Sequence, residues 1–309
     1  MLKPVGTDVL KGLIFASLGF FIFSSGDALA KYLSSSYSVP QLIFWAQISA
    51  LIMLCGISIV KEKTLEKGIK SLVVSPAFRL HILRGSILGI QVYFTFYAFS
   101  QIPLSQAYTL IFCAPLFASL ISRLWLKETV TLKSWIVLLV GFSGILIILR
   151  PGFGALDIEM LLPLLSALFS GFLFAFGHVA GRRLDSHDSP LMLGFYPASF
   201  GLIYGGIYMA LSGENFVPGT PADALMMVLL GIASIGGLLF VTWAFRVGPV
   251  PVVSSFHYTQ LIWGTLFGVI FFGDKADIWT WIGAVPIVGS GLYLTWMQRR
   301  PPYPATKYK

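Results

Sequence analysis

Charged residues are scarce in this chain of 309 residues, of which Asp, Glu, Lys and Arg together make up 11%. That share is about half of what soluble domains usually contain. Apolar residues account for 56% of the chain, and the mean hydropathy is +0.83. This balance argues against a soluble fold and predicts a protein that crosses a membrane many times.

Cysteine is rare as well, and nucleotide-binding motifs are missing. The two cysteines, Cys55 and Cys113, lie far apart without a second thiol at metal-ligand spacing, so we interpret them as packing residues. No CxxC, HExxH or P-loop is present, and no GxGxxG lies between a strand and a helix. We therefore expect no metal, no cofactor and no ATP hydrolysis on this chain, which leaves movement coupled to a gradient or no coupling.

Ten apolar segments reach or approach the roughly 20 residues that a helix needs to cross a bilayer core. They are residues 9–33, 40–60, 80–100, 103–126, 134–149, 160–181, 190–211, 224–245, 251–272 and 279–297. Most connections are short and carry Pro and Gly turn signals. The predicted fold class is an all-α polytopic membrane protein with ten transmembrane helices.

A sequence echo at an offset of 146 residues ties the two halves of the chain together. The matching pairs are Tyr97 with Trp243, Pro103 with Pro249, Phe117 with Trp263, Glu128 with Asp274 and Trp135 with Trp281. Because each half contains five predicted spans, the second half enters the membrane upside down. We predict two inverted five-helix repeats, residues 1–152 and 153–309, which is the architecture of secondary transporters.

The distribution of basic residues predicts the topology. With a cytoplasmic N-terminus, all of the 21 Lys and Arg residues except Lys31, Arg150 and Lys275 fall inside. We expect a multi-pass protein of the bacterial inner (plasma) membrane, surrounded by the lipid bilayer, with both termini cytoplasmic. The net charge of +8 is then a topology signal, and nucleic acid is not an expected partner because the basic residues are dispersed among loops.

Several short motifs follow one another along the chain. They are Leu83-Arg84-Gly85, Tyr97-Ala98-Phe99, Ile102-Pro103-Leu104 and Leu149-Arg150-Pro151-Gly152 in the first half, and Ala244-Phe245, Gly248-Pro249 and Phe272-Gly273-Asp274 in the second. In order, spacing and duplication they resemble the EamA branch of the drug/metabolite transporter superfamily. The resemblance implies two inverted repeats around a central cavity and a small organic solute, such as an amino acid, an amine, a nucleoside or S-adenosylmethionine.

The same resemblance places the segments 134–149 and 279–297 at the periphery, where they are candidates for a homodimer contact. Glycines in these segments permit close approach between helices. They are Gly141, Gly144, Gly283, Gly289 and Gly291. Packing inside one subunit explains these glycines equally well.

Ionisable residues within apolar segments cost about 2.5 to 3.5 kcal/mol at the bilayer centre, so they are candidates for gating or coupling. Asp27 either forms a helical ion pair with Lys31 one turn away or attracts a cation or a proton from the pathway. Arg84 either extends to the lipid headgroups or closes an inner gate by pairing with Asp185 or Asp188.

Two further residues are assigned to gating or coupling. His178 lies near the cytoplasmic end of the segment 160–181, where an interfacial position is favoured over a central one. Pro115 lies inside the segment 103–126 and predicts a kink or hinge, because proline interrupts the backbone hydrogen bonds of a helix.

His257 is the most prominent ionisable residue of the second half. It shares a helical face with Gln260 and Gly264, and a polar stripe on a membrane helix must face protein or water. His257 therefore binds substrate, senses pH or carries a proton, or else it is a hydrogen-bonded structural residue. Tyr258 points in a neighbouring direction and is a second candidate for the binding site.

Amphipathic side chains in the middle of the spans complete the predicted binding site. They are Trp45, Gln91, Tyr97, Tyr108, Trp243 and Trp263. A site with aromatic walls and little fixed charge suits a flat or cationic organic solute through stacking and cation–π contacts.

The predicted mechanism is alternating access, in which the hairpins 80–126 and 224–272 close opposite sides of the membrane in turn. A membrane scaffold or a lipid-handling membrane protein is the main alternative. A membrane-embedded enzyme is a weaker one, because ionisable and nucleophilic residues are too sparse to form a catalytic cluster at one depth.

Overall fold

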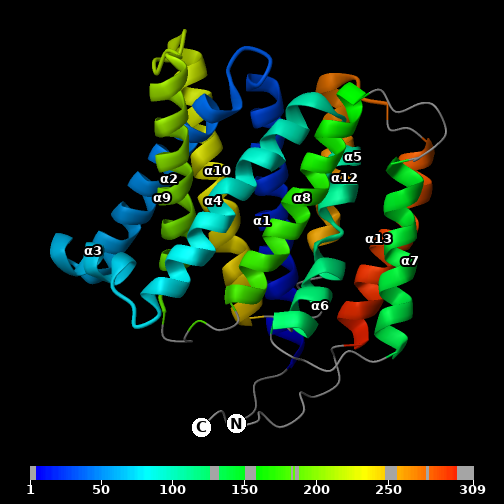
Figure 1. The fold of residues 1–309 in the computed structure, drawn as a ribbon. Coiled ribbons are helices and arrows are strands. Elements are labelled where there is room, and N and C mark those ends of the chain that lie inside the picture. Colours follow the sequence, from blue (N-terminus) through cyan, green and yellow to red (C-terminus); the bar gives the residue numbers. More distant parts are fainter. Residues whose placement is uncertain are drawn as a thin grey trace.

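The computed structural model describes residues 5–125, 132–149, 158–181, 184, 188–247, 256–275 and 278–297. Within these ranges every regular element is a helix, and most of the helices stand side by side as a bundle (Figure 1). In chain order they are α1 (Val5–Leu33), α2 (Val39–Glu62), α3 (Leu65–Val73), α4 (Phe78–Gln101), α5 (Leu104–Ile111), α6 (Ala114–Trp125), α7 (Leu132–Leu149), α8 (Ile158–Gly181), α9 (Pro190–Ser212), α10 (Pro221–Val247), the 3₁₀ turn η1 (Phe256–Tyr258), α12 (Thr259–Phe272) and α13 (Ile278–Met297).

Seven described helical segments are long and apolar enough to cross a membrane. Three shorter apolar helices lie at Trp135–Ile147, Phe256–Phe272 and Ile278–Ser290. Each of the predicted apolar segments contains helix. The structure thus confirms the all-α polytopic membrane fold, and ten complete spans stay a prediction because three of these helices are short.

Local sequence signals explain where the repeat-related helices α2 and α9 begin. Each starts with a serine cap, Ser38 or Ser189, followed within two residues by proline. The serine hydroxyl accepts a backbone N–H that has no partner inside the helix, and proline has no N–H to leave unpaired. α9 ends at Gly213, whose φ of 70° is the left-handed conformation that glycine adopts without strain.

Helix α3 was not predicted from the sequence. It occupies the long connection between α2 and α4, where the Thr64 hydroxyl accepts the Lys67 N–H and begins the helix. Its buried residues, Gly68 and Leu72, lie on one face, and the helix packs against α2. The corresponding connection of the second half, between α9 and α10, contains no helix, so α3 is an addition to the first half.

The first half contains an interrupted helix, and the second half has a 3₁₀ turn at the matching position. The segment predicted at 103–126 divides into α5 and α6 at Phe112 and Cys113, just before Pro115. Proline cannot donate a backbone hydrogen bond, which explains this break. In the second half the 3₁₀ turn η1 gives way to α12 after Tyr258, which lies 146 residues beyond Phe112. Leu261 occupies the position that matches Pro115, so proline does not explain the 3₁₀ turn.

The contacts between helices of the two halves are the same when the halves are interchanged. α1 packs along α10, and its counterpart α8 packs along α4; likewise α2 packs on α10 and α9 on α4. α7 and α13 pack against each other at one side of the bundle (Figure 1). This exchange supports two repeats, whose boundaries at 152 and 153 stay a prediction.

Two of the five glycines pack within one subunit. A Cβ atom added to Gly144 of α7 would lie 2.4 Å from the Gly283 carbonyl oxygen of α13, and one added to Gly141 would lie 2.4 Å from the Leu116 side chain of α6. A Cβ on Gly289 would meet no atom within 4 Å. Gly141 and Gly144 therefore need no partner subunit to explain them.

Candidate functional site

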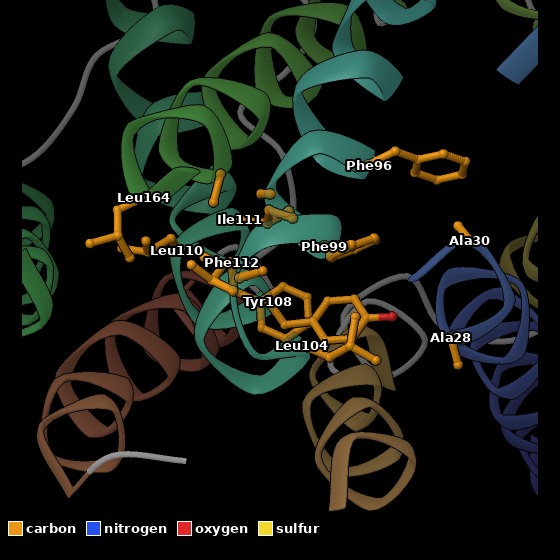
Figure 2. Packing of buried hydrophobic residues seen from close by; sticks show 14 of the residues in the cluster. Ala28, Ala30, Phe96, Phe99, Leu104, Tyr108, Leu110, Ile111, Phe112 and Leu164 are labelled. Carbon is orange, nitrogen blue, oxygen red and sulfur yellow. The ribbon is translucent and has the colours of Figure 1, made fainter. Parts of the chain in front are cut away.

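The α5–α6 break and the 3₁₀ turn η1 bring aromatic rings of the two halves together. Tyr108 of α5 stacks on Phe112 with ring centroids 5.8 Å apart. Phe112 meets the ring of His257 edge-on at 5.0 Å and that of Tyr258 at 5.5 Å. Figure 2 shows Tyr108 and Phe112 next to each other in the core around α5. Side chains from both halves thus meet at one point.

Helices α1 and α8 supply the remaining rings. Phe20 of α1 stacks on His257 at 5.2 Å, and Phe174 of α8 lies 5.8 Å from the same imidazole. Phe174 also contacts His178 at 4.0 Å. We call the six residues Phe20, Tyr108, Phe112, Phe174, His178 and His257 the aromatic site. Tyr108 and Phe112 are buried, His257 is half-buried and His178 is exposed.

Asp27 of α1 joins the aromatic site through Tyr108. The Tyr108 hydroxyl donates to the Asp27 carboxylate at 2.5 Å and lies 3.5 Å from the hydroxyl of Ser24. In Figure 2 this hydroxyl points toward α1. The predicted ion pair between Asp27 and Lys31 is wrong, because Lys31 pairs with a residue of the second half instead.

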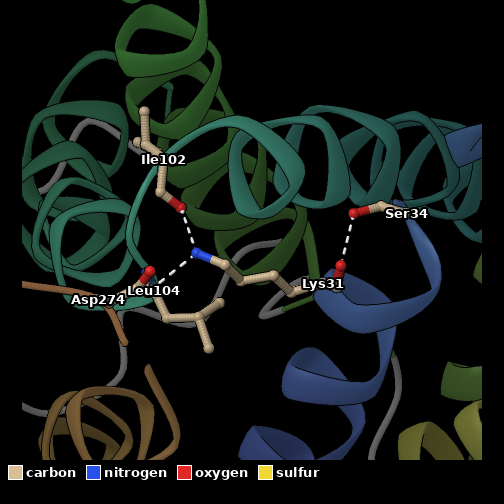
Figure 3. Close-up of polar contacts among 5 residues, drawn as sticks. All are labelled: Lys31, Ser34, Ile102, Leu104 and Asp274. Carbon is tan, nitrogen blue, oxygen red and sulfur yellow. Dashed lines mark hydrogen bonds and ion pairs between the residues drawn. The ribbon is translucent and has the colours of Figure 1, made fainter. Parts of the chain in front are cut away.

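Lys31 is the centre of a polar cluster at the end of α1 (Figure 3). Its ammonium group lies 2.9 Å from the Asp274 carboxylate and donates to the Ile102 carbonyl oxygen at 3.0 Å. The same carboxylate oxygen accepts the backbone N–H of Leu104 at 3.3 Å. We call these four residues the polar lock, because they join α1 to the α4–α5 turn and to Asp274, the second residue after α12. Lys31 and Asp274 are 13% and 16% exposed, so the pair is largely withdrawn from solvent.

Arg84 lies toward the other end of α4. It is 8% exposed and donates to the Leu193 carbonyl oxygen of α9 at 2.9 Å, so it does not extend to the headgroups. Asp188, one of its two predicted partners, binds His81 at 3.0 Å instead. The other, Asp185, lies outside the described residues. His81 also stacks on Tyr196 of α9 at 5.0 Å, so this end of α4 is held to α9 by several polar and aromatic contacts.

His178 is the residue of the aromatic site whose surroundings include Arg84. It is close enough to interact electrostatically with Arg84, and His257 is close enough to interact with His178. One ring nitrogen of His178 contacts the Phe174 carbonyl oxygen at 2.8 Å. The structure thus brings His178 near His257, although His178 itself is exposed. Its interfacial depth in the membrane stays a prediction.

Outside the spans, Tyr37 connects the α1–α2 turn to α10. Its hydroxyl donates to Asp223 at 2.7 Å and accepts the backbone N–H of Gly219 at 2.9 Å. The hydrogen bond to Asp223 raises the pKa of Tyr37 above its ordinary value, because it favours the protonated hydroxyl. Within the described part of the chain, no group of His, Cys, Asp and Glu residues could hold a metal ion.

Comparison with known proteins decides the family. The model of the EamA-like transporter family matches residues 10–150 and again residues 161–296. The chain belongs to the EamA-like transporter family. The two matches correspond to the two halves that the sequence echo relates.

Relatives of this EamA-like protein are similar along nearly their whole length. A riboflavin transporter of Vibrio cholerae is 26% identical, covering 93% of each chain. A pseudopaline exporter of Pseudomonas aeruginosa is 27% identical over 91% of this chain and 95% of its own. An S-adenosylmethionine uptake transporter of Rickettsia prowazekii is 22% identical over 94% of both. A solved crystal structure with a TM-score of 0.60 and 19% identity covers 96% of this chain and 99% of its own, which shows the fold alone.

The predicted binding residues of this EamA-like protein are spread more widely than the sequence suggested. Gln91 donates to Thr95 and to Ser170 of α8 at 2.7 and 2.8 Å. Trp45 donates its indole N–H to the Phe216 carbonyl oxygen at 2.7 Å, and Trp243 is 56% exposed. None of these three has a ring or hydrogen-bond contact with the aromatic site among the described residues.

Tyr258 contacts the aromatic site through Phe112, and the other predicted residues differ in burial. Gln260 is buried one turn after His257, and the Tyr258 hydroxyl and Trp263 indole nitrogen are buried without a hydrogen-bond partner within the described residues. Tyr97 is half-buried. Gly264, which shares the predicted stripe of His257, faces Tyr108: an added Cβ would lie 2.1 Å from the tyrosine ring.

Phe20, Phe112 and Phe174 were missed as site residues because the sequence analysis treated most phenylalanines as lipid-facing. Phe112 could have been found from its position, which matches that of Tyr258 in the second half. Nothing local distinguishes Phe20 or Phe174 from the other 24 of the 26 phenylalanines, because their role depends on which helix lies opposite.

Proposed function

We propose that this protein is a secondary transporter that moves a small organic metabolite across the bacterial inner membrane by alternating access. The observation that supports this most directly is the meeting of the α5–α6 break with the repeat-related 3₁₀ turn η1, where Phe112 contacts His257 and Tyr258. Discontinuous helices at a repeat interface form the binding sites of many secondary transporters. Both termini lie in the cytoplasm in this proposal, as the basic residues predict.

The aromatic site suits a solute with a flat ring or a cationic group. Rings from α1, α5, α8 and η1 offer stacking faces, and the two histidines add hydrogen-bonding nitrogens. Riboflavin and S-adenosylmethionine, named for two of the relatives, both contain flat heteroaromatic rings. The solute class proposed here is therefore an aromatic or cationic metabolite, with amines, amino acids and nucleosides as the other candidates.

The polar lock provides a switch for alternating access. It joins the first half to the second at one end of the bundle, and that end opens only if the Lys31–Asp274 pair separates. The proposed cycle breaks this pair when the outer side opens and forms it again when the inner side opens.

Thermal stabilisation by solutes tests the proposed site. The purified protein is heated with riboflavin, S-adenosylmethionine, adenosine, single amino acids or amines, alongside His257→Ala and Trp243→Ala, an exposed aromatic control. A solute that raises the melting temperature of the parent and of Trp243→Ala, but not of His257→Ala, supports the proposal, since a ligand stabilises the state that binds it. Equal stabilisation of all three proteins would contradict the location of the site.

Uptake into proteoliposomes tests the transport function itself. Saturable accumulation of the stabilising solute supports the transporter. If no solute stabilises the protein and none enters the vesicles, the membrane scaffold or lipid-handling protein becomes the better description.

A homodimer through α7 and α13 stays part of the proposal, although Gly141 and Gly144 no longer support it. A groove of about 380 Å³ lies between these helices, lined in part by Val140, Pro286, Gly289 and Tyr293. Gly289→Trp would fill the groove, so it should shift a dimer to a monomer in mass measurements of the solubilised protein. Gly144→Ala tests packing inside the subunit instead.

A further inference from the structure

Asp27 is a carboxylate inside an apolar span without a cation beside it. It belongs to the span Leu10–Leu33, and within the described residues it accepts a hydrogen bond from the hydroxyl of Tyr108. The one nearby basic residue of α1, Lys31, is held by Asp274 and Ile102. Among the described residues no Lys, Arg or His forms an ion pair with Asp27.

The helices around Asp27 offer no compensating charge either. α10 contributes Leu230 and Ala233 opposite Gly26, and residues 226–245 of that helix contain no ionisable side chain. α12 contains none, and α5 contains only Tyr108. α4 contributes Tyr93 and Tyr97 to this half of the bundle, and η1 contributes His257 and Tyr258.

A lone carboxylate in this environment favours binding of a positive charge. Its ionised form costs about 2.5 to 3.5 kcal/mol at the centre of a bilayer unless it finds a partner. One hydroxyl donor stabilises the negative charge only partly. Uptake of a proton removes the cost without requiring the space that a hydrated metal ion would need.

Tyr108 connects this carboxylate to the aromatic site. Its ring stacks on Phe112, which contacts His257, and it fits against Gly264 where a single added carbon would clash. A ring packed this closely has little room to move by itself. A solute that inserts against Phe112 and His257 must therefore displace Tyr108, and the hydroxyl then leaves Asp27.

We propose that Asp27 is the proton-binding site that couples solute movement to a proton gradient, and that Tyr108 transmits solute binding to it. This inference rests on the proposed transport function. A proton from water adds to one carboxylate oxygen of Asp27 to form a neutral acid, and the same O–H bond breaks when the proton returns to water on the opposite side. Tyr108 stabilises the ionised acid, so its departure on solute binding favours proton uptake.

Infrared difference spectroscopy tests the proton site without any solute. The protein in lipid is titrated between acidic and alkaline buffer, and the C=O stretching band of a protonated carboxyl is followed. The parent and Asp223→Asn, which removes the carboxylate bound by Tyr37, should share a titrating band that Asp27→Asn lacks. Tyr108→Phe should keep the band and move its titration to higher pH. The other acidic residues titrate in all of these proteins, so the decisive quantity is the difference between the parent and Asp27→Asn spectra. If that difference contains no titrating carboxyl band, the proposal is overturned.

Transport of riboflavin as a probe gives the second measurement. In proteoliposomes the ratio of uptake with and without a proton gradient should exceed unity for the parent and for Asp223→Asn, and fall to unity for Asp27→Asn. Equal acceleration by the gradient in Asp27→Asn would overturn coupling through this residue. If the infrared band behaves as expected but neither riboflavin nor any other solute moves, the proton site stands and the transport function fails.

Discussion

Two tyrosine–aspartate pairs in this protein use the same hydrogen bond in different surroundings. Tyr108 donates to Asp27 at 2.5 Å, and Tyr37 donates to Asp223 at 2.7 Å. Asp223 lies at the start of α10, where it also accepts the Thr220 hydroxyl at 2.7 Å and where the helix dipole favours a negative charge. Asp27 has no such support inside α1.

The comparison shows that the hydrogen bond alone does not assign a function. At the start of α10 several donors and solvent share the charge, so the pair fastens a loop to a helix. Within α1 the carboxylate accepts a hydrogen bond from one hydroxyl, that of Tyr108, so movement of that hydroxyl changes what the carboxylate binds. The environment of the pair decides between a structural contact and a coupling site.

The largest effect is expected from Gly264→Val, which pushes Tyr108 away from Asp27. A Cβ there would lie 2.1 Å from the ring of Tyr108, and overpacking of this kind costs about 1–3 kcal/mol. Thermal unfolding should show a marked loss of stability, accompanied by loss of solute stabilisation. Gly289→Ala is the control, since its added Cβ meets no atom within 4 Å. Similar losses in both variants would contradict close packing at Gly264 as the cause.

Lys31→Met tests whether Lys31 supports Asp27 or Asp274. Removing the ammonium group leaves Asp274 without its charged partner, and lost hydrogen bonds to charged groups cost about 1.5–3 kcal/mol. We expect a lower melting temperature, with no change in the titrating carboxyl band assigned to Asp27. The double variant with Asp274→Asn should recover part of the lost stability, because no unpaired carboxylate remains. A shift of the Asp27 band would show that Lys31 serves Asp27 after all.

Tyr108→Phe should lower the stability less than Gly264→Val or Lys31→Met, since the ring and its stacking on Phe112 are kept. One hydrogen bond is lost, but Asp27 can take up a proton in its place, which limits the cost to about 1 kcal/mol, and the melting temperature should fall slightly. The gradient-driven part of riboflavin uptake should be largely lost, while the melting temperature changes little. Loss of stability without loss of gradient response would make Tyr108 a structural residue.

Tyr37→Phe should have the smallest effect on stability, because the pair at the loop is open to solvent. The pKa of Tyr37 is raised by its bond to Asp223, so this contribution is present below the pKa of an unfolded tyrosine, near 10, and is lost as the pH rises through the folded value. Melting curves of parent and variant should differ slightly at neutral pH and converge in strongly alkaline buffer. A gap that widens toward alkaline pH would contradict this sign.

Much of the membrane architecture was predictable because the bilayer restricts the choice of structure. A backbone in hydrocarbon must satisfy its own hydrogen bonds, so long apolar segments become helices wherever they occur. Pro115 predicted the break between α5 and α6, because proline cannot donate a backbone hydrogen bond. The 3₁₀ turn at Phe256–Tyr258 had no such mark, and α3 was missed because a short surface helix leaves a weak signal between two strong ones.

The sequence by itself determined that the chain is helical, crosses a membrane repeatedly and has two related halves, because composition, segment length and the echo at 146 residues are properties of the chain alone. Only the tertiary structure decided the partners of the buried charges. Asp27 and Lys31 are one turn apart and of opposite sign, yet Asp27 binds Tyr108, 81 residues away, and Lys31 binds Asp274, 243 residues away. Pairing depends on which helices lie opposite, and that follows from the packing of both halves together.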